Sequence, residues 1–140
     1  MKKTLILLAG LSVLGFGKNI VVGNTLVNTA TNLQWQDTMD VPTETYLFEA
    51  AIQRCEDLVL DGYDDWRLPN LNEMIFQTNY QIEAAASKGF TYNFAPVAQD
   101  TWTSTPHATG YYGFANKWGN FNKHTTATYH GTVRCVRDYK

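Results

Sequence analysis

Two cysteines, Cys55 and Cys135, constrain the fold of this 140-residue chain more than any other feature. A disulfide between them would tie the middle of the chain to its C-terminal end. The loop that it closes is about 80 residues long, for which the chain-entropy description gives a stabilisation of about 4–5 kcal/mol. The alternatives are a reactive thiol or a metal ligand, but a thiolate nucleophile needs a neighbouring histidine or a helix N-terminus to lower its pKa. Because Cys55 lies late in a predicted helix, we favour the disulfide.

Residues 1–17 predict a secretory signal peptide. Two lysines precede Leu5–Phe16, a run without charges that is shorter than the roughly 20 residues of a membrane span. Gly15 and Gly17 supply small residues at alternate positions, so we expect cleavage before Lys18. An uncleaved anchor is the alternative. Cleavage would leave a periplasmic or secreted protein without a stable membrane anchor, in a compartment where disulfides form.

The charge of the expected mature chain limits its partners. Removing residues 1–17 takes away two of the 11 basic residues and none of the 13 acidic ones, so the net charge becomes −4. This mildly acidic balance gives the chain no electrostatic reason to bind nucleic acid or an anionic membrane. The sequence also indicates no cofactor.

The first half of the chain predicts two strands and then two helices. We expect residues 18–25 to form a short leader and residues 26–140 to form a single domain. Leu26–Val27 and Leu33–Gln36 predict short strands, joined by a turn in which Asn32 takes a positive φ angle.

Two helices are expected to follow. Thr43 or Thr45 can cap the first helix, and a turn at residues 61–62 ends it. Its predicted buried face consists of Leu47, Ala51, Cys55 and Leu58. Asn70 and Glu73 have the spacing of a capping box, which predicts the start of the second helix. The apolar stripe of that helix consists of Leu71, Met74 and Ile75.

From residue 101 onward, apolar and polar residues alternate with a period of two, which predicts strands. We expect strands at residues 101–103, 111–118, 121–128 and 132–137, with Gly119 and Asn120 forming a hairpin turn. The predicted fold class is therefore α+β, with two short helices in the first half and an antiparallel, β-rich second half.

Five motif segments follow one another along the chain: Thr31–Gln36, Ala50–Leu58, Gly62–Asn70, Thr101–Ser104 and Val133–Arg137. Their order and spacing resemble the Lcl C-terminal domain family, named after the domain that ends the Legionella collagen-like adhesin and found in many exported bacterial proteins. The resemblance runs from about Leu26 to Asp138. It implies a compact α+β domain, distantly similar to the C-type-lectin fold, in which Cys55 pairs with Cys135.

The same segments contain the residues that we expect to be structural. Trp35, Trp66 and Trp102 are predicted core residues, and Pro69 belongs to the motif that precedes the second helix. We expect Arg67 and Arg134 to form structural ion pairs.

The chain departs from the family in two ways. The adhesin's own domain binds sulfated glycosaminoglycans, which requires clustered cations, whereas Lys and Arg are scattered here. Where the family commonly has Asp and Gly in the first turn, this chain has Asn28 and Asn32, which argues against a cation site in that turn.

A predicted hairpin supplies the candidate ligand-binding residues. Flat aromatic faces stack on sugar rings, and amides form hydrogen bonds with hydroxyl groups. One face, with Tyr112, Phe114 and Trp118, is expected to fill the core, whereas Tyr111 on the opposite face is expected to be exposed. The candidate ligand-binding residues are Tyr111, Asn116, Asn120, Asn122 and Lys123.

Three aspartates are weak candidates for a calcium site. Asp61, Asp64 and Asp65 surround Gly62, and hard oxygen ligands in a glycine-containing loop suit calcium. The alternative is a turn whose carboxylates pair with Arg67 or Arg134. The histidines, at positions 107, 124 and 130, do not have the spacing of a zinc site on a helix.

No group of residues predicts a catalytic mechanism, which would need a nucleophile and a base within reach of each other. The leading hypothesis is therefore an exported, single-domain binding module for glycans or a cell-surface partner. A small exported enzyme with an unrecognised site and a structural protein-interaction domain are the alternatives.

Overall fold

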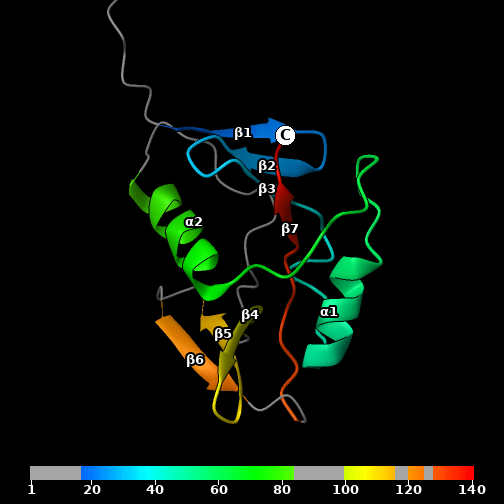
Figure 1. The fold of residues 1–140 in the computed structure, drawn as a ribbon, viewed down its shortest axis with the longest axis vertical. Coiled ribbons are helices and arrows are strands. Elements are labelled where there is room, and N and C mark those ends of the chain that lie inside the picture. The colour runs from blue at the N-terminus through cyan, green and yellow to red at the C-terminus, as the bar shows by residue number, and fades with distance from the viewer. Residues whose placement is uncertain (1–16, 84–99, 116–119, 125–127) are drawn as a thin grey trace, which may run out of the picture.

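A computed structural model describes residues 17–83, 100–115, 120–124 and 128–140 of the chain. These ranges contain two helices and seven strands (Figure 1). In chain order they are β1 (Asn19–Val22), β2 (Thr25–Asn28), β3 (Leu33–Gln36), α1 (Phe48–Glu56), α2 (Leu71–Glu83), β4 (Thr101–His107), β5 (Gly110–Ala115), β6 (Asn120–His124) and β7 (Val136–Asp138).

The strands form two antiparallel sheets, with the strand orders β1-β2-β3-β7 and β4-β5-β6. The predicted α+β class is confirmed, whereas the similarity to the C-type-lectin fold stays a prediction. Residues 1–16 lie outside the described ranges, so the signal peptide also stays a prediction. Within those ranges, no helix is long and apolar enough to span a membrane.

The four-stranded sheet joins the two ends of the chain. Gly23, with a φ angle of 57°, lies in the turn between β1 and β2, and Asn32, with a φ angle of 52°, lies in the turn between β2 and β3, as predicted. β7 pairs with β3 on the far side of this hairpin. The sheet therefore consists of segments that precede Cys55 or follow Cys135.

Residues 18–25 are part of this sheet and not the separate leader that we expected. β1 lies antiparallel to β2, with Ile20 opposite Val27. The Lys18 carbonyl accepts a hydrogen bond from the Thr29 N–H at 2.9 Å. β-branched residues favour extended backbone when a neighbouring strand offers pairing, and β2 supplies that pairing here.

The first helix begins later than predicted, so neither threonine caps it. The Thr43 hydroxyl donates a hydrogen bond to the Met39 carbonyl at 3.0 Å. Tyr46 forms an isolated β-bridge, and α1 starts only at Phe48 without a side-chain cap. Leu47 is consequently exposed instead of buried, and Phe48 takes the inward position. The other residues of the predicted buried face are buried: Ala51, Cys55 and Leu58.

The start of α2 is as predicted. The Asn70 side-chain oxygen accepts a hydrogen bond from the Glu73 N–H at 2.8 Å, and the Glu73 carboxylate accepts one from the Asn70 N–H at 2.8 Å. This reciprocal pair is a capping box. The helix packs against the first sheet in a core cluster made of Leu26, Leu33, Trp35, Leu71, Met74 and Val136, with Ile75 packed on it.

A second core cluster surrounds the disulfide. Cys55 and Cys135 are bonded, with their Cα atoms 5.5 Å apart, and both residues are fully buried. The predicted disulfide is therefore present, and it removes both thiols of the chain. The other buried members of this cluster are Phe48, Ala51, Leu58, Trp66, Leu68, Trp102 and Val133.

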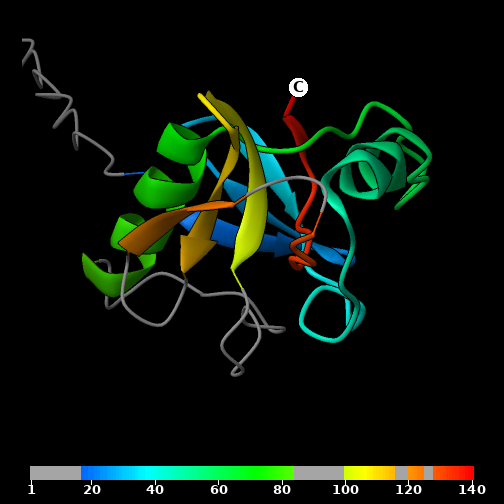
Figure 2. The same cartoon turned by 90° about the horizontal axis from the view of Figure 1, so that it is seen from below.

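The three-stranded sheet lies beside α2 (Figure 2). Its register places Tyr111 of β5 opposite His124 of β6, and Gly113 opposite Asn122. Gly119 of the predicted hairpin turn lies outside the described residues. The last strand starts at Val136, later than predicted, because the preceding segment forms isolated bridges with other parts of the chain. α1 and α2 lie on opposite sides of this C-terminal segment in both views (Figure 1 and Figure 2).

Candidate functional site

Tyr111 of the predicted ligand-binding hairpin is not the exposed ring that the sequence indicated. Its ring stacks on Phe48, with the ring centroids 3.6 Å apart and the planes 16° from parallel. It is half-buried against the second core cluster. Because Phe48 instead of Leu47 points inward at the start of α1, an apolar face is available to the Tyr111 ring. Tyr111 therefore contributes to packing.

Only some polar residues of the hairpin lie within the ranges that the structure describes. Asn122 is exposed and donates a hydrogen bond to the Asp100 carboxylate at 2.9 Å. Asn116 lies outside the described residues, and so do the side chains of Asn120 and Lys123. A ligand-binding role for these residues stays a prediction.

Asp100 is the centre of a polar cluster beside the hairpin. Its buried carboxylate lies 2.6 Å from Nε2 of His124, and its N–H donates a hydrogen bond to the Tyr129 hydroxyl at 2.6 Å. The His124 and Tyr129 rings are stacked, with centroids 3.5 Å apart, and Trp102 meets both rings edge-on. Burial, together with the negative charge of Asp100, raises the pKa of Tyr129 above its ordinary value. A carboxylate that fixes an imidazole in this way is the arrangement that general acid–base chemistry uses.

A second group of residues holds an aromatic ring at the surface, and sequence reasoning missed it. We call Tyr63, Asp65 and Arg137 the Tyr63 platform. The Arg137 guanidinium carbon lies 3.7 Å from the centroid of the Tyr63 ring, and Tyr63 is 41% exposed. Arg137 itself is buried: its Nε and Nη2 atoms donate to the two oxygens of Asp65 at 2.5 and 3.2 Å, and its Nη1 atom donates to Gln34 at 2.5 Å. The hydrogen bonds from Arg137 hold the pKa of Asp65 below its ordinary value.

The backbone under the Tyr63 ring is fixed by a tight turn. Leu60 and Tyr63 exchange two backbone hydrogen bonds of 3.0 Å. The residues between them, Asp61 and Gly62, both have positive φ angles, 52° and 86°. The Trp66 indole N–H donates a third hydrogen bond to the Tyr63 carbonyl at 3.0 Å. Asp-Gly is the usual sequence of such a turn. A turn at residues 61–62 was predicted, but as the end of the first helix, which already ends at Glu56.

The three calcium candidates do not converge on one point. The Asp61 carboxylate accepts hydrogen bonds from the backbone and side-chain nitrogens of Asn24 at 2.7 and 2.9 Å, and the loop tip lies beside the β1–β2 turn (Figure 1). Asp65 is paired with Arg137, and Asp64 is exposed. Among the residues that the structure describes, no group of three or more His, Cys, Asp or Glu side chains could hold a metal ion.

The two predicted structural arginines form ion pairs, but not with these aspartates. Arg67 contacts Glu73 at 2.8 Å and Asp138 at 3.6 Å. Arg134 is completely buried, lies 3.6 Å from Asp37 and donates a hydrogen bond to a backbone carbonyl. Burial lowers the pKa of Arg134 to about 9. The remaining motif residues, Trp35, Trp66 and Pro69, are buried.

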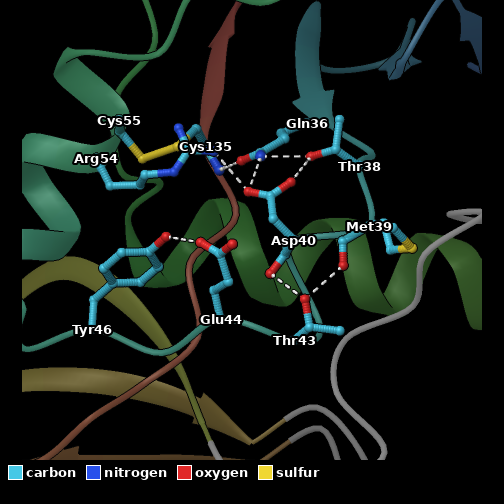
Figure 3. A network of polar contacts seen from close by, with 10 residues as sticks. All are labelled: Gln36, Thr38, Met39, Asp40, Thr43, Glu44, Tyr46, Arg54, Cys55 and Cys135. Atoms are coloured by element: carbon cyan, nitrogen blue, oxygen red, sulfur yellow. Dashed lines mark hydrogen bonds and ion pairs between the residues drawn. A yellow bond between two sulfur atoms is a disulfide. The ribbon is translucent and has the colours of Figure 1, made fainter.

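A third polar network connects the loop before α1 to the helix (Figure 3). The Asp40 carboxylate accepts hydrogen bonds from Thr38, from Gln36 and, at 2.7 Å, from Arg54. Burial alone would raise the pKa of Asp40, but these hydrogen bonds hold it below its ordinary value. Gln36 also accepts a hydrogen bond from the Cys135 N–H at 3.2 Å. The network therefore anchors the loop next to the disulfide.

Comparison with known protein families shows a relationship over most of the chain. The sequence model of the Lcl C-terminal domain matches residues 24–137, which cover most of the chain. No curated protein matches the chain significantly.

Proposed function

The chain belongs to the Lcl C-terminal domain family, and from this membership we propose that it is an exported binding module whose ligand is a neutral glycan. A domain of this family ends a bacterial adhesin, which supports a role in binding or adhesion. The buried disulfide supports an exported location, since such bonds persist in oxidising compartments. N-terminal sequencing of protein taken from the cell envelope tests the location, and an intact Met1 on a cytoplasmic product would contradict it.

The observation that carries the choice of a neutral ligand is the pairing of every arginine. The chain has four arginines, Arg54, Arg67, Arg134 and Arg137, and each lies within 4.0 Å of an aspartate or glutamate. A sulfated polymer binds clustered cations that are free to exchange their counterions. These arginines are already neutralised by acidic neighbours, and acidic residues outnumber basic ones. Neutral sugars do not require such charges.

A glycan array tests this proposal directly. The mature protein, residues 18–140, would be applied to immobilised neutral oligosaccharides and to sulfated glycosaminoglycans at about 50 mM and about 500 mM salt. We expect binding to neutral oligosaccharides that changes little with salt. Binding to sulfated polymers that falls steeply with salt would contradict the neutral ligand, and binding to no glycan would contradict the proposal as a whole.

One observation favours a second candidate function, a small exported enzyme. Asp100 and His124 form a carboxylate–imidazole pair in a partly buried site. Screening the mature protein with chromogenic esters and glycosides tests this candidate. Turnover that is lost in His124→Gln would establish it, whereas turnover unchanged in that variant, or no turnover, would count against it.

A further inference from the structure

We infer that the Tyr63 platform is the surface on which this module stacks a neutral sugar ring. The inference rests on the proposed function, because it names the site at which the glycan would bind. It replaces the exposed aromatic that the sequence suggested, Tyr111, by one that lies on the loop between α1 and α2.

Tyr63 is an exposed aromatic residue that is supported from one side. The Arg137 guanidinium covers one face of Tyr63 at 3.7 Å. Arg137 covers only this face, and Tyr63 as a whole is 41% exposed. An aromatic face with a polar edge offers the apolar C–H side of a pyranose a flat surface and leaves the hydroxyl groups of the sugar in water. Tyr111 is less accessible, since it is half-buried and stacked on Phe48 in the second core cluster.

A polar group, the Asp65 carboxylate, binds the same guanidinium that supports the Tyr63 ring. The side chain of Asp65 is 49% exposed, and its two oxygens each accept one hydrogen bond from Arg137. A carboxylate has about four acceptor positions, so about two remain for sugar hydroxyls. Hydrogen bonds to a charged acceptor are stronger than neutral ones. Apolar surface together with a few fixed polar groups is the usual composition of a small-molecule site.

The Tyr63 platform is fixed before any ligand binds. The backbone of Tyr63 makes three hydrogen bonds, to Leu60 and Trp66. Arg137 is 4% exposed and is held by Asp65 and Gln34. Because the ring, the guanidinium and the carboxylate are already in place, a ligand would order few side chains on binding. Ordering side chains costs free energy, and a preorganised site avoids that cost.

The decisive experiment compares variants of mature protein on immobilised neutral oligosaccharides built of glucose, galactose, mannose and N-acetylglucosamine. Tyr63→Ala is expected to weaken binding by about tenfold or more, which corresponds to about 1.4 kcal/mol. Tyr63→Phe keeps the ring and is expected to stay within about threefold of the wild type. Phe76→Ala is the matched control, because Phe76 is an aromatic residue of similar exposure, 47%, that belongs to α2. Equal binding by Tyr63→Ala and the wild type would overturn the site and leave the proposed function standing.

A second measurement does not depend on a variant that folds. The Trp66 indole N–H donates to the Tyr63 carbonyl, so its NMR signal should shift when the same oligosaccharides are added to the wild type. The indole signals of Trp35 and Trp102, which are completely buried, should not shift. A bound glycan that leaves the Trp66 signal unchanged would overturn the site. A wild-type protein that binds none of the oligosaccharides would overturn the proposed function, and this inference with it.

Discussion

Tyr111 on β5 and Tyr63 on the loop after α1 are each supported on one face by another side chain, but Tyr111 is half-buried and Tyr63 is exposed. Tyr111 rests on the apolar ring of Phe48 and is drawn into the core around the disulfide. Tyr63 rests on a guanidinium whose polar edges are satisfied by Asp65 and Gln34. The comparison indicates that the chemistry of the support decides whether an aromatic residue packs or presents its face. An apolar support adds to burial, whereas a paired cation can hold a ring at the surface.

The largest expected effect comes from cutting the covalent link between the two supports. Cys55 lies on α1, which begins with Phe48, and Cys135 lies two residues before Arg137. Replacing both cysteines by serine is expected to lower the free energy of unfolding by about 4–5 kcal/mol. Urea denaturation measures this, with reduced wild-type protein as the control. An unchanged midpoint would show that the stability of the folded protein does not depend on the bond.

The next largest effect is expected for the apolar support. Phe48→Ala removes a buried ring under Tyr111 and is expected to cost about 3–4 kcal/mol. Leu47→Ala, one residue earlier and exposed, is expected to stay within about 0.5 kcal/mol of the wild type. Denaturation curves of the two variants give the comparison. Similar losses in both would mean that α1 starts in another register.

The two rings themselves are expected to separate stability from binding. Tyr111→Ala should lower the free energy of unfolding by about 1–3 kcal/mol, because its half-buried ring is lost from the core cluster. Tyr63→Ala should lower it by less than about 1 kcal/mol, because Tyr63 is an exposed residue outside the core clusters. Thermal denaturation ranks the two variants. The reverse order would show that the loop, and not the hairpin, needs its tyrosine for folding.

The smallest expected effect concerns the carboxylate that supports Arg137. The pKa of Asp65 is lower in the folded protein than its ordinary value of 3.8. Its stabilisation is therefore complete above the unfolded pKa and is lost as the pH falls through the folded one. Asp65→Asn should cost on the order of 0.5 kcal/mol at pH 7, because Asp65 is half-exposed.

The difference in stability between wild type and Asp65→Asn should shrink below about pH 4. Denaturation over a range of pH values measures it, with Asp64→Asn as the control for removing a neighbouring exposed carboxylate. A difference that grows as the pH falls would show that Asp65 is not stabilised by its contact with Arg137.

Local patterns explain which parts of this fold were predictable. Asn70 and Glu73 are three residues apart and form the predicted capping box, because all atoms involved belong to one helical turn. The disulfide was predictable from the rarity of cysteine together with the expected compartment. The start of α1 was not predictable, because Thr43 is taken up by a turn and its hydroxyl bonds the Met39 carbonyl.

The Tyr63 platform depended on contacts that no local pattern contains. Asp65 and Arg137 are 72 positions apart, and Gln34 and Arg137 are 103 positions apart. Sequence reasoning considered Asp65 as a calcium ligand or as a partner of Arg67 or Arg134. Its actual partner is Arg137, which comes close only when β7 joins the first sheet. Tyr111 was expected to be exposed for the same reason. The alternation of residues along the strand predicted the side of the sheet on which Tyr111 lies, but it could not predict that Phe48 packs against that side.

The pairing of β7 with β3 has a consequence for the order in which the molecule can form. β1, β2 and β3 leave the ribosome first, but the strand that completes their sheet, Val136–Asp138, follows only after residues 37–135. The same delay applies to Cys135, and so to the disulfide. The four-stranded sheet and the disulfide can therefore be completed only after residues 135–138 have been synthesised. A nascent chain of this topology stays incompletely folded until late, which is the state that passage across a membrane as an extended polypeptide requires.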